Sequence, residues 1–293
     1  MSSPFRPVIG ITLGDVAGVG PEVVEKALNS GQLPAHCDYK IIGEYPSPRP
    51  GKPDQITSRA AFDGLKAAAA ALKSGEIQAV ATAPVSKIGL MNVGFRWPGQ
   101  TEYFAEALGC EDVTMILSGN HLTVALVTIH VPYRDVPTLL TEQGIWRTAR
   151  HLAQFLRLAK GIVHPRIAVA GLNPHAGEEG AFGTEEITLV RPAIDKLSPG
   201  FPGEISGPFP PDTLFHQAVQ GRFDGVVCLY HDQGLIPLKL LDFDNAVNIT
   251  MGLPAPRTSP DHGTAFDIAG KDIASASSMI SAIQLAARLA TPI

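Results

Sequence analysis

The stretch RIAVAGLNPHAGEEGAFGTEE, residues 166–186, joins two patterns that together decide the fold. Its first residues form a short apolar, β-branched run, which is typical of a strand buried on both faces of a sheet. A glycine-rich loop with His175 follows, and in an open α/β sheet ligands bind beyond the carboxyl ends of the strands. The end of the stretch predicts a new helix, with Thr184 as its cap and Glu185 and Glu186 in its first turn.

The same alternation recurs along the chain. Further strands are predicted at 7–14, 77–84, 113–119, 122–130 and 225–231, and helices at 21–30, 58–75, 141–161 and 276–290. Loops are predicted at the proline-rich segments 44–55 and 198–213, and the stretches 99–109 and 240–271 are interpreted as polar loops. Strands that alternate with helices predict an α/β fold with a largely parallel sheet and helices on both faces.

Composition excludes several classes of protein. The chain has 293 residues, of which 45% are hydrophobic, so it can bury a large core as one large or two moderate domains. The net charge of −5, without a run of Lys or Arg, argues against nucleic acid or an anionic membrane as a partner. Three widely spaced cysteines indicate neither a disulfide framework nor a thiolate zinc site. No run of about 18 apolar residues and no leader-like N-terminus is present, so we expect a cytoplasmic protein.

Three histidines share one position in the pattern. His130, His175 and His231 each follow a predicted strand, so they can meet at one edge of the sheet. A single histidine there is usually an ordinary polar loop residue. Three neutral imidazoles, however, are a common set of ligands for a divalent metal that keeps positions open for substrate and water.

Other polar residues are ambiguous from the sequence. Lys239 and Arg257 suit a carboxylate or phosphate group, although either cation is more often a solvated surface residue. The glycine-rich loop 14–28 is either a tight turn or a phosphate cradle at a helix N-terminus. It has neither the G-x-G-x-x-G order nor a G-K-[ST] ending, so neither a Rossmann nor a P-loop site is indicated.

Several motifs together resemble one known family. GITLGDVAGVGPEVV, TAPVSK, GQTEYFAE, LNPHAGEEGAFGTEE, GPFPPDTLF, YHDQGLIPLK and NITMGLPAPRTSPDHGTAFDIAG occur in the order seen in the 4-hydroxythreonine-4-phosphate dehydrogenase (PdxA-like) family. The resemblance implies two α/β/α domains of the isocitrate/isopropylmalate dehydrogenase type, with the active site in the cleft between them. Residues 1–96 plus 245–293 would form the cofactor-side domain, and residues 97–244 the domain for metal, substrate and dimerisation.

The resemblance also implies an activity and its residues. The family oxidises a secondary alcohol with NAD or NADP, and the β-keto acid that results loses carbon dioxide. It implies a homodimer with one divalent metal (Zn, Mg or Co) at the interface, bound by His130, His175 and His231. The other implied residues are Lys239 and Asp212 for catalysis, Gln100, Thr101, Lys239, Asn248 and Arg257 for substrate, and His262, Gly263 and Asp267 for the cofactor.

Two departures from the family pattern bear on the substrate. The family has GHTE where this chain has GQTE, so Gln100 replaces a histidine, and the region 44–58 is short. The expected substrate is 4-phosphohydroxy-L-threonine, oxidised and decarboxylated to 3-amino-2-oxopropyl phosphate for pyridoxal phosphate synthesis. The alternatives within the family are D-threonate or D-erythronate 4-phosphate and a cis-dihydrodiol carboxylate. A ligand-binding sensor without turnover is the non-enzymatic alternative.

Overall fold

The computed structural model describes residues 5–290, and the chain divides into two compact units. Unit 1 consists of Met1–Glu111 with Asp244–Ile293, and unit 2 of Asp112–Phe243. The sequence placed the first boundary after residue 96, whereas the structure keeps 97–111 in unit 1. The reason is packing: Tyr103 and Phe104, on the helix within this segment, belong to the same apolar cluster as Phe62 and Phe95.

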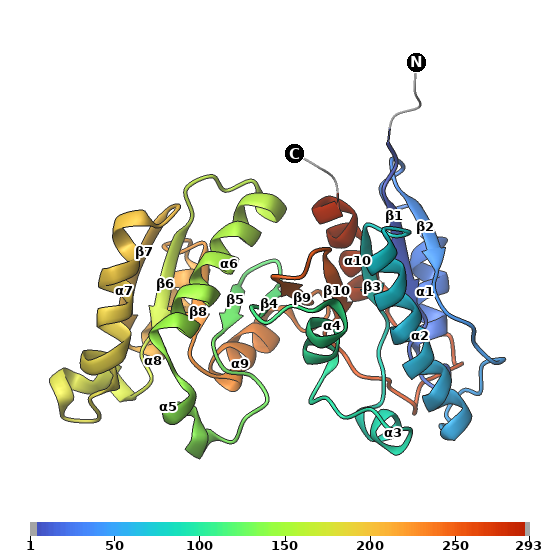
Figure 1. The fold of residues 1–293 in the computed structure, drawn as a ribbon, viewed down its shortest axis with the longest axis horizontal. Coiled ribbons are helices and arrows are strands. Elements are labelled where there is room, and N and C mark those ends of the chain that lie inside the picture. Colours follow the sequence, from blue (N-terminus) through green and yellow to red (C-terminus); the bar gives the residue numbers. More distant parts are fainter. Residues whose placement is uncertain (1–4, 291–293) are drawn as a thin grey trace. The chain divides into compact units, whose positions relative to one another are not determined.

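Unit 1 is built on a mostly parallel sheet (Figure 1). Its strands are β1 (Val8–Thr12), β2 (Asp38–Ile41), β3 (Ala79–Thr82), β9 (Val247–Met251) and β10 (Arg257–Pro260), in the order β2-β1-β3-β10-β9. Only the β9–β10 pair of this unit is antiparallel among the pairings described. Its helices are α1 (Gly20–Leu28), α2 (Gln55–Ser74), α3 (Lys87–Asn92), α4 (Gln100–Leu108) and α10 (Ser277–Ala290).

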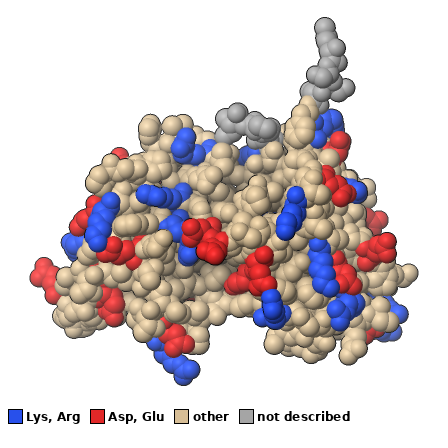
Figure 2. All heavy atoms as spheres, viewed as in Figure 1, with Lys and Arg blue, Asp and Glu red and all other residues tan. Residues whose placement is uncertain are grey.

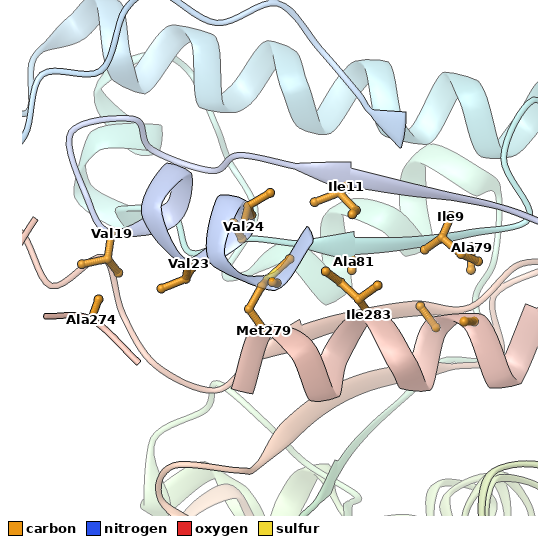
Figure 3. Packing of buried hydrophobic residues seen from close by; sticks show 14 of the residues in the cluster. Ile9, Ile11, Val19, Val23, Val24, Ala79, Ala81, Ala274, Met279 and Ile283 are labelled. Atoms are coloured by element: carbon orange, nitrogen blue, oxygen red, sulfur yellow. The ribbon is translucent and has the colours of Figure 1, made fainter. Parts of the chain in front are cut away.

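Helices cover both faces of this sheet, as strand alternation requires. Ala79 and Ala81 of β3 pack in one apolar cluster with Met279 and Ile283 of α10, as Figure 3 shows. Val80, between the two alanines, points to the other face and joins the cluster of α2 and α4. Both faces of β3 are therefore buried, which is why its first three residues, Ala79–Ala81, are apolar.

Unit 2 repeats this architecture. Its strands are β4 (Thr114–Ser118), β5 (Thr123–Leu126), β6 (Arg166–Ala170), β7 (Glu204–Phe209) and β8 (Gly225–Cys228), in the order β4-β5-β8-β6-β7. The β4–β5 pair is an antiparallel hairpin, and the other pairings described in this unit are parallel. Its helices are α5 (Val136–Leu139), α6 (Glu142–Lys160), α7 (Arg191–Leu197), α8 (Pro211–Val219) and α9 (His231–Asp242), with short helical turns at Tyr133–Asp135, Pro174–Gly180, Glu186–Val190 and Ser198–Gly200.

Strand β8 shows how α6 and α9 cover opposite faces of this second sheet. A Cβ atom on Gly225 would lie 3.0 Å from Leu152 of α6, so α6 packs closely over that face. Gly234 of α9 lies against Cys228, and a Cβ atom there would come within 2.9 Å of the sulfur. Side chains alternate between the two faces along a strand, so residues 225 and 228, three positions apart, face opposite sides. The absence of a side chain at Gly234 lets α9 lie directly on the sheet.

The α/β fold predicted from the sequence is confirmed, but four strands and the helices α3, α4, α5 and α9 were not predicted. The predicted loop 198–213 contains β7, an edge strand that pairs only with β6 among the described strands; proline and glycine are tolerated at such an edge. The predicted polar loop 240–271 contains β9 and β10, and 99–109 contains α4. The sequence analysis also missed β2, whose residues are largely exposed. Segment 44–53 has neither helix nor strand, as predicted.

The described part of the chain also bears on membrane association and charge. Among residues 5–290, no helix combines the length and apolar character that a membrane span needs. Lys and Arg side chains are interspersed with Asp and Glu side chains on the face drawn in Figure 2. That face therefore has no extended patch of one sign.

Candidate functional site

The three histidines follow neighbouring parallel strands of unit 2. The strands lie in the order β5-β8-β6, and His130, His231 and His175 come shortly after them in that order. Parallel strands present their carboxyl ends at one edge of a sheet, so all three histidines are at the same edge. The prediction that each of the three histidines follows a strand is therefore confirmed.

His130 and His231 lie next to each other at this edge. Their ring centroids are 5.8 Å apart, and both line a cavity of about 180 Å³ with Tyr133 and Tyr230. His175 lies apart from this pair within the described contacts: its ring packs on Phe182 with centroids 6.0 Å apart. Among residues 5–290, no group of three or more His, Cys, Asp or Glu side chains is close enough to hold a metal ion. The three-histidine metal site therefore stays a prediction.

Asp232 fixes the orientation of the His231 ring. Its Oδ1 lies 2.6 Å from Nδ1 of His231, and since a carboxylate only accepts, Nδ1 is the donor. The Tyr133 hydroxyl donates to Oδ2 of the same carboxylate at 2.5 Å. These two hydrogen bonds lower the pKa of Asp232 and keep it charged. With Nδ1 committed, the lone pair of the neutral His231 ring is on Nε2, the arrangement common in metal-binding histidines.

The backbone at His175 has an unusual conformation. Six consecutive residues, 175–180, have positive φ, so the turn Pro174–Gly180 is left-handed. Four of the six are not glycine, and a left-handed conformation costs each of these about 1–2 kcal/mol. Strain of this kind persists only where surrounding contacts impose it, and it is concentrated at functional sites. The turn that bears His175 is therefore a candidate functional segment.

The start of the next helix differs from the sequence prediction. Thr184 makes no side-chain cap; instead its carbonyl accepts from the amides of Ile187 and Thr188. Glu186 lies in the first turn as predicted, but its side chain is 1% exposed and its carboxylate accepts from the amides of Leu172 and Asn173 in the His175 loop. The sequence did not predict this role. The only signal available was a pair of acidic residues beside a glycine-rich loop.

In unit 1, Arg257 is the centre of a second polar group. It is 3% exposed, and its Nε and Nη2 donate to the Thr82 hydroxyl at 3.1 and 2.8 Å. Nη2 also donates to Oε1 of Gln100 at 3.0 Å. Burial lowers the pKa of Arg257 to about 10, although the Glu102 carboxylate favours the charged form. The guanidinium is thus charged at neutral pH and hydrogen-bonded to two neutral side chains, an arrangement suited to an anionic ligand.

Thr101 and Asn248 belong to the same face of unit 1. Arg257 pairs with Thr250 across the antiparallel β10–β9 ladder, and Asn248 is two residues before Thr250, so the three side chains share one face. The Thr101 hydroxyl lies 3.2 Å from the Thr250 hydroxyl. Oδ1 of Asn248 is buried and has no hydrogen-bond partner among the described residues. A buried acceptor of this kind needs a donor, which a ligand or an ordered water can supply.

The structure thus brings together four residues of unit 1 that are predicted to bind substrate, Gln100, Thr101, Asn248 and Arg257, and their role stays a prediction. Thr82 and Thr250, which contact them directly, were missed. Thr82 was part of the TAPVSK motif, but nothing in the spacing related it to Arg257.

The two predicted catalytic residues are in unit 2. Lys239 is half-buried in α9, the helix that begins with His231. Asp212 is exposed in the first turn of α8, and α8 packs against the left-handed turn of His175. Neither pairs with His130, His175 or His231 in a described contact.

The predicted cofactor residues lie in a loop that packs on the glycine-rich turn after β1. The Thr264 carbonyl accepts from the amide of Val19, and a Cβ atom on Gly18 would come within 2.6 Å of that oxygen. Nδ1 of His262 donates to the carbonyl of Gly263 at 3.0 Å. Nε2 of His262 is buried without a partner in the described part of the chain. Asp267 is exposed nearby.

Comparisons with known proteins give consistent matches. The family model of the pyridoxal phosphate biosynthetic protein PdxA matches residues 19–286. A 4-hydroxythreonine-4-phosphate dehydrogenase of Desulforapulum autotrophicum is 40% identical over 329 aligned residues, covering 98% of this chain and 96% of that protein.

Solved structures agree with these matches. A 4-hydroxythreonine-4-phosphate dehydrogenase from Klebsiella pneumoniae has 37% identity and a TM-score of 0.79, covering 98% of this chain and 100% of that one. A terephthalate 1,2-cis-dihydrodiol dehydrogenase from Burkholderia xenovorans LB400 has 28% identity and a TM-score of 0.68, covering 97% and 98%. An isocitrate dehydrogenase from Methylococcus capsulatus, at 18% identity and TM-score 0.55, covers 97% and 88% and shares the fold.

Proposed function

The chain belongs to the family of the pyridoxal phosphate biosynthetic protein PdxA, and from this membership we propose that it oxidises and decarboxylates 4-phosphohydroxy-L-threonine. The observation that carries the proposal is the cluster of buried Arg257 and Thr101 with half-buried Gln100 and Asn248 in unit 1. It offers a charged guanidinium for a phosphate or carboxylate and an unpartnered buried acceptor for a substrate donor. We also propose Lys239, in α9 of unit 2, as a cation that binds the substrate.

The reaction has two steps. A secondary alcohol gives up hydride from carbon and a proton from oxygen, and the β-keto acid then loses carbon dioxide and takes up a proton on carbon. We assign binding and orientation to Gln100, Thr101, Asn248 and Arg257. Lys239 binds the anionic end of the substrate and donates a proton, and Asp212 relays a proton.

The histidines at the strand ends of unit 2 are suited to the metal. His130 and His231 are neighbours, and the contact of Nδ1 of His231 with Asp232 leaves Nε2 as its ligand atom. We propose that His175 completes the set. When bound, a divalent ion (Zn, Mg or Co) supplies Lewis acidity toward the substrate oxygen in both steps.

The loop of His262, Gly263 and Asp267 is suited to NAD or NADP. Because Nδ1 of His262 donates to a carbonyl, its buried Nε2 is an acceptor without a donor, as an adenine amino group would require. The cofactor itself supplies the hydride acceptor.

We further propose a homodimer, located in the cytoplasm, with the metal site at the interface. Helix α9, which begins with His231, exposes Ile236 and Leu240, and Phe243 follows directly after it; they are 66%, 84% and 67% exposed. This spacing forms one apolar stripe on a helix. A stripe of that kind suits contact with its own copy across a two-fold axis.

The discriminating experiment is a substrate panel. The protein is assayed for reduction of NAD and NADP with added Zn, Mg or Co on 4-phosphohydroxy-L-threonine, D-threonate 4-phosphate, D-erythronate 4-phosphate and a cis-dihydrodiol carboxylate. We expect the highest kcat/KM, with carbon dioxide release, on the first. Gln100, where the family has histidine, favours the two 4-phospho sugar acids as the second candidate. Tight binding of these compounds without turnover would instead identify a sensor.

A further inference from the structure

We propose that Glu186 is a positioning residue that keeps the left-handed turn of His175 in the conformation needed for metal binding. The inference rests on the proposed function, because it takes His175 to be a metal ligand. It assigns a role to a side chain outside the predicted set of site residues.

Both oxygens of this carboxylate face the segment between β6 and His175. Oε1 accepts from the main-chain amides of Leu172 and Asn173, each at 2.7 Å. Oε2 accepts from Nδ2 of Asn173 at 2.9 Å. The side chain of Glu186 is fully buried, so these donors have no water to replace it. One acceptor thus satisfies three donors immediately before the turn begins.

The turn itself packs directly on this carboxylate. Gly177, with φ of 81°, lies so close that a Cβ atom would be 2.8 Å from Oε2 of Glu186. The amide of Ala176 donates to the carbonyl of Asn173, so the residue that Glu186 holds is also the first hydrogen-bond acceptor of the turn. A change in the position of Asn173 would therefore move His175.

A second buried side chain connects this segment to the strand end that leads to His231. Gln233 of α9 donates from Nε2 to the carbonyl of Gly171 at 2.6 Å. Its Oε1 accepts from the amide of Leu229 at 2.7 Å. Glu186 and Gln233 thus form hydrogen bonds with adjacent residues of one segment. Together they connect the start of the His175 loop to the end of β8.

Glu185 provides a matched control. Its carboxylate accepts from the same Nδ2 of Asn173, at 2.7 Å, but it contacts neither the Leu172 nor the Asn173 main chain in the described contacts. Glu185 is also partly exposed. Removing it takes away one side-chain contact and leaves the two main-chain amides satisfied.

The experiment measures Co²⁺ binding by calorimetry and by the visible absorption of the bound ion, with amide hydrogen exchange of residues 172–180. In Glu186→Ala we expect the Kd for Co²⁺ to rise roughly 10–100-fold. Exchange should speed up at 172–180 and stay unchanged over β5 and β8. Glu186→Gln retains an oxygen for the two main-chain amides, so it should recover most of the affinity. Glu185→Ala should match the unmodified protein.

The inference is overturned if Glu186→Ala and Glu185→Ala have the same Kd, or if exchange speeds up equally throughout unit 2. Should Glu186→Ala fail to fold, Glu186→Asp replaces it; its shorter side chain withdraws the carboxylate from the amides of Leu172 and Asn173, and unchanged exchange and Kd there would equally overturn the proposal.

Failure of the proposed metal site is recognised separately, with His175→Ala. If His175→Ala binds Co²⁺ as well as the unmodified protein, His175 is not a ligand and the proposed site is wrong. If His175→Ala loses Co²⁺ and Glu186→Ala retains it, only the positioning role of Glu186 is wrong.

Discussion

Arg257 and Gln100 meet through a hydrogen bond of 3.0 Å from Nη2 to Oε1, which joins the first residue of β10 to the first residue of α4. The contact orients the glutamine amide, because its oxygen must face the guanidinium and its Nε2 then donates elsewhere. A histidine at this position could accept from Arg257 with one nitrogen and donate with the other. It would differ from glutamine in titrating near neutral pH.

This difference predicts a shift in substrate preference in Gln100→His. We expect kcat/KM on 4-phosphohydroxy-L-threonine to rise about 2–10-fold relative to the D-threonate and D-erythronate 4-phosphates, the range of one hydrogen bond. Steady-state kinetics on all three substrates measure the ratio. Gln100→Asn is the control, because its amide is too short to reach Arg257 and should lower all three values together. A constant ratio in Gln100→His would refute a role for this position in specificity.

Arg257→Lys tests the binding of the substrate anion. A lysine ammonium cannot reproduce the planar fork that contacts both Thr82 and Gln100, so the charge would be retained but misplaced. We expect kcat/KM to fall about 10–100-fold, the effect of a charge-assisted hydrogen bond, mostly through KM. Arg59→Lys, at an exposed position on α2, should leave the kinetics unchanged. Equal kinetics in the two variants would exclude Arg257 from the substrate site.

Residues with a local signature could be predicted from the sequence. Strands β1, β3, β5, β6 and β8 are buried on both faces, so their apolar runs were visible, and the strand-end rule then located the three histidines. Strand β9 was missed because Asn248 interrupts its apolar pattern, and β10 was missed because its sequence, Arg257–Pro260, has no apolar run. The polar residues that mark the candidate site thus concealed the strands that carry it.

Residues that act through distant contacts could not be predicted in this way. Thr82 meets Arg257 only because β3 and β10 are neighbours in the sheet. Glu186 looked like an ordinary acidic residue of a first helical turn. Its burial depends on how the helix start packs against the end of β6, which local spacing does not encode.

Loss of metal binding is predicted for His231→Ala and His130→Ala. Since the two rings are neighbours, each deletion should remove a ligand from the same ion and abolish turnover while the fold remains. Calorimetry with Zn²⁺ or Co²⁺ on chelator-treated protein measures the effect. His164→Ala, at an exposed loop position, is the matched control and should bind metal normally. Normal affinity in either of the first two variants would remove that histidine from the ligand set.

His151 predicts a pH dependence of stability in unit 2. Burial has the largest effect and lowers the pKa of His151, and Arg147 lowers it further, whereas Asp112 raises it. Nδ1 of His151 lies 2.9 Å from the Thr114 hydroxyl. When folding lowers the pKa of a histidine, the folded state favours the neutral form of its ring. Its contribution to the free energy of unfolding is complete above the unfolded pKa of about 6.5 and is lost as pH falls toward the folded pKa.

His151→Asn should therefore lose less stability between pH 7.5 and pH 5 than the unmodified protein. Denaturant unfolding at the two pH values measures this difference. An unchanged pH dependence in the variant would mean that His151 does not protonate on unfolding in this range.

Leu240→Asp tests the proposed homodimer. Leu240 is the most exposed residue of the apolar stripe Ile236, Leu240 and Phe243, and a carboxylate there would have to be desolvated without a partner in any contact that buries the stripe. We expect size-exclusion chromatography with light scattering to show a shift from dimer to monomer, with loss of activity because the metal site is proposed at the interface. Ile273→Asp, at an equally apolar position that is 66% exposed in unit 1, should remain dimeric and active. A Leu240→Asp protein that stays dimeric would place the interface elsewhere, whereas an active monomer would show that one chain forms a complete site.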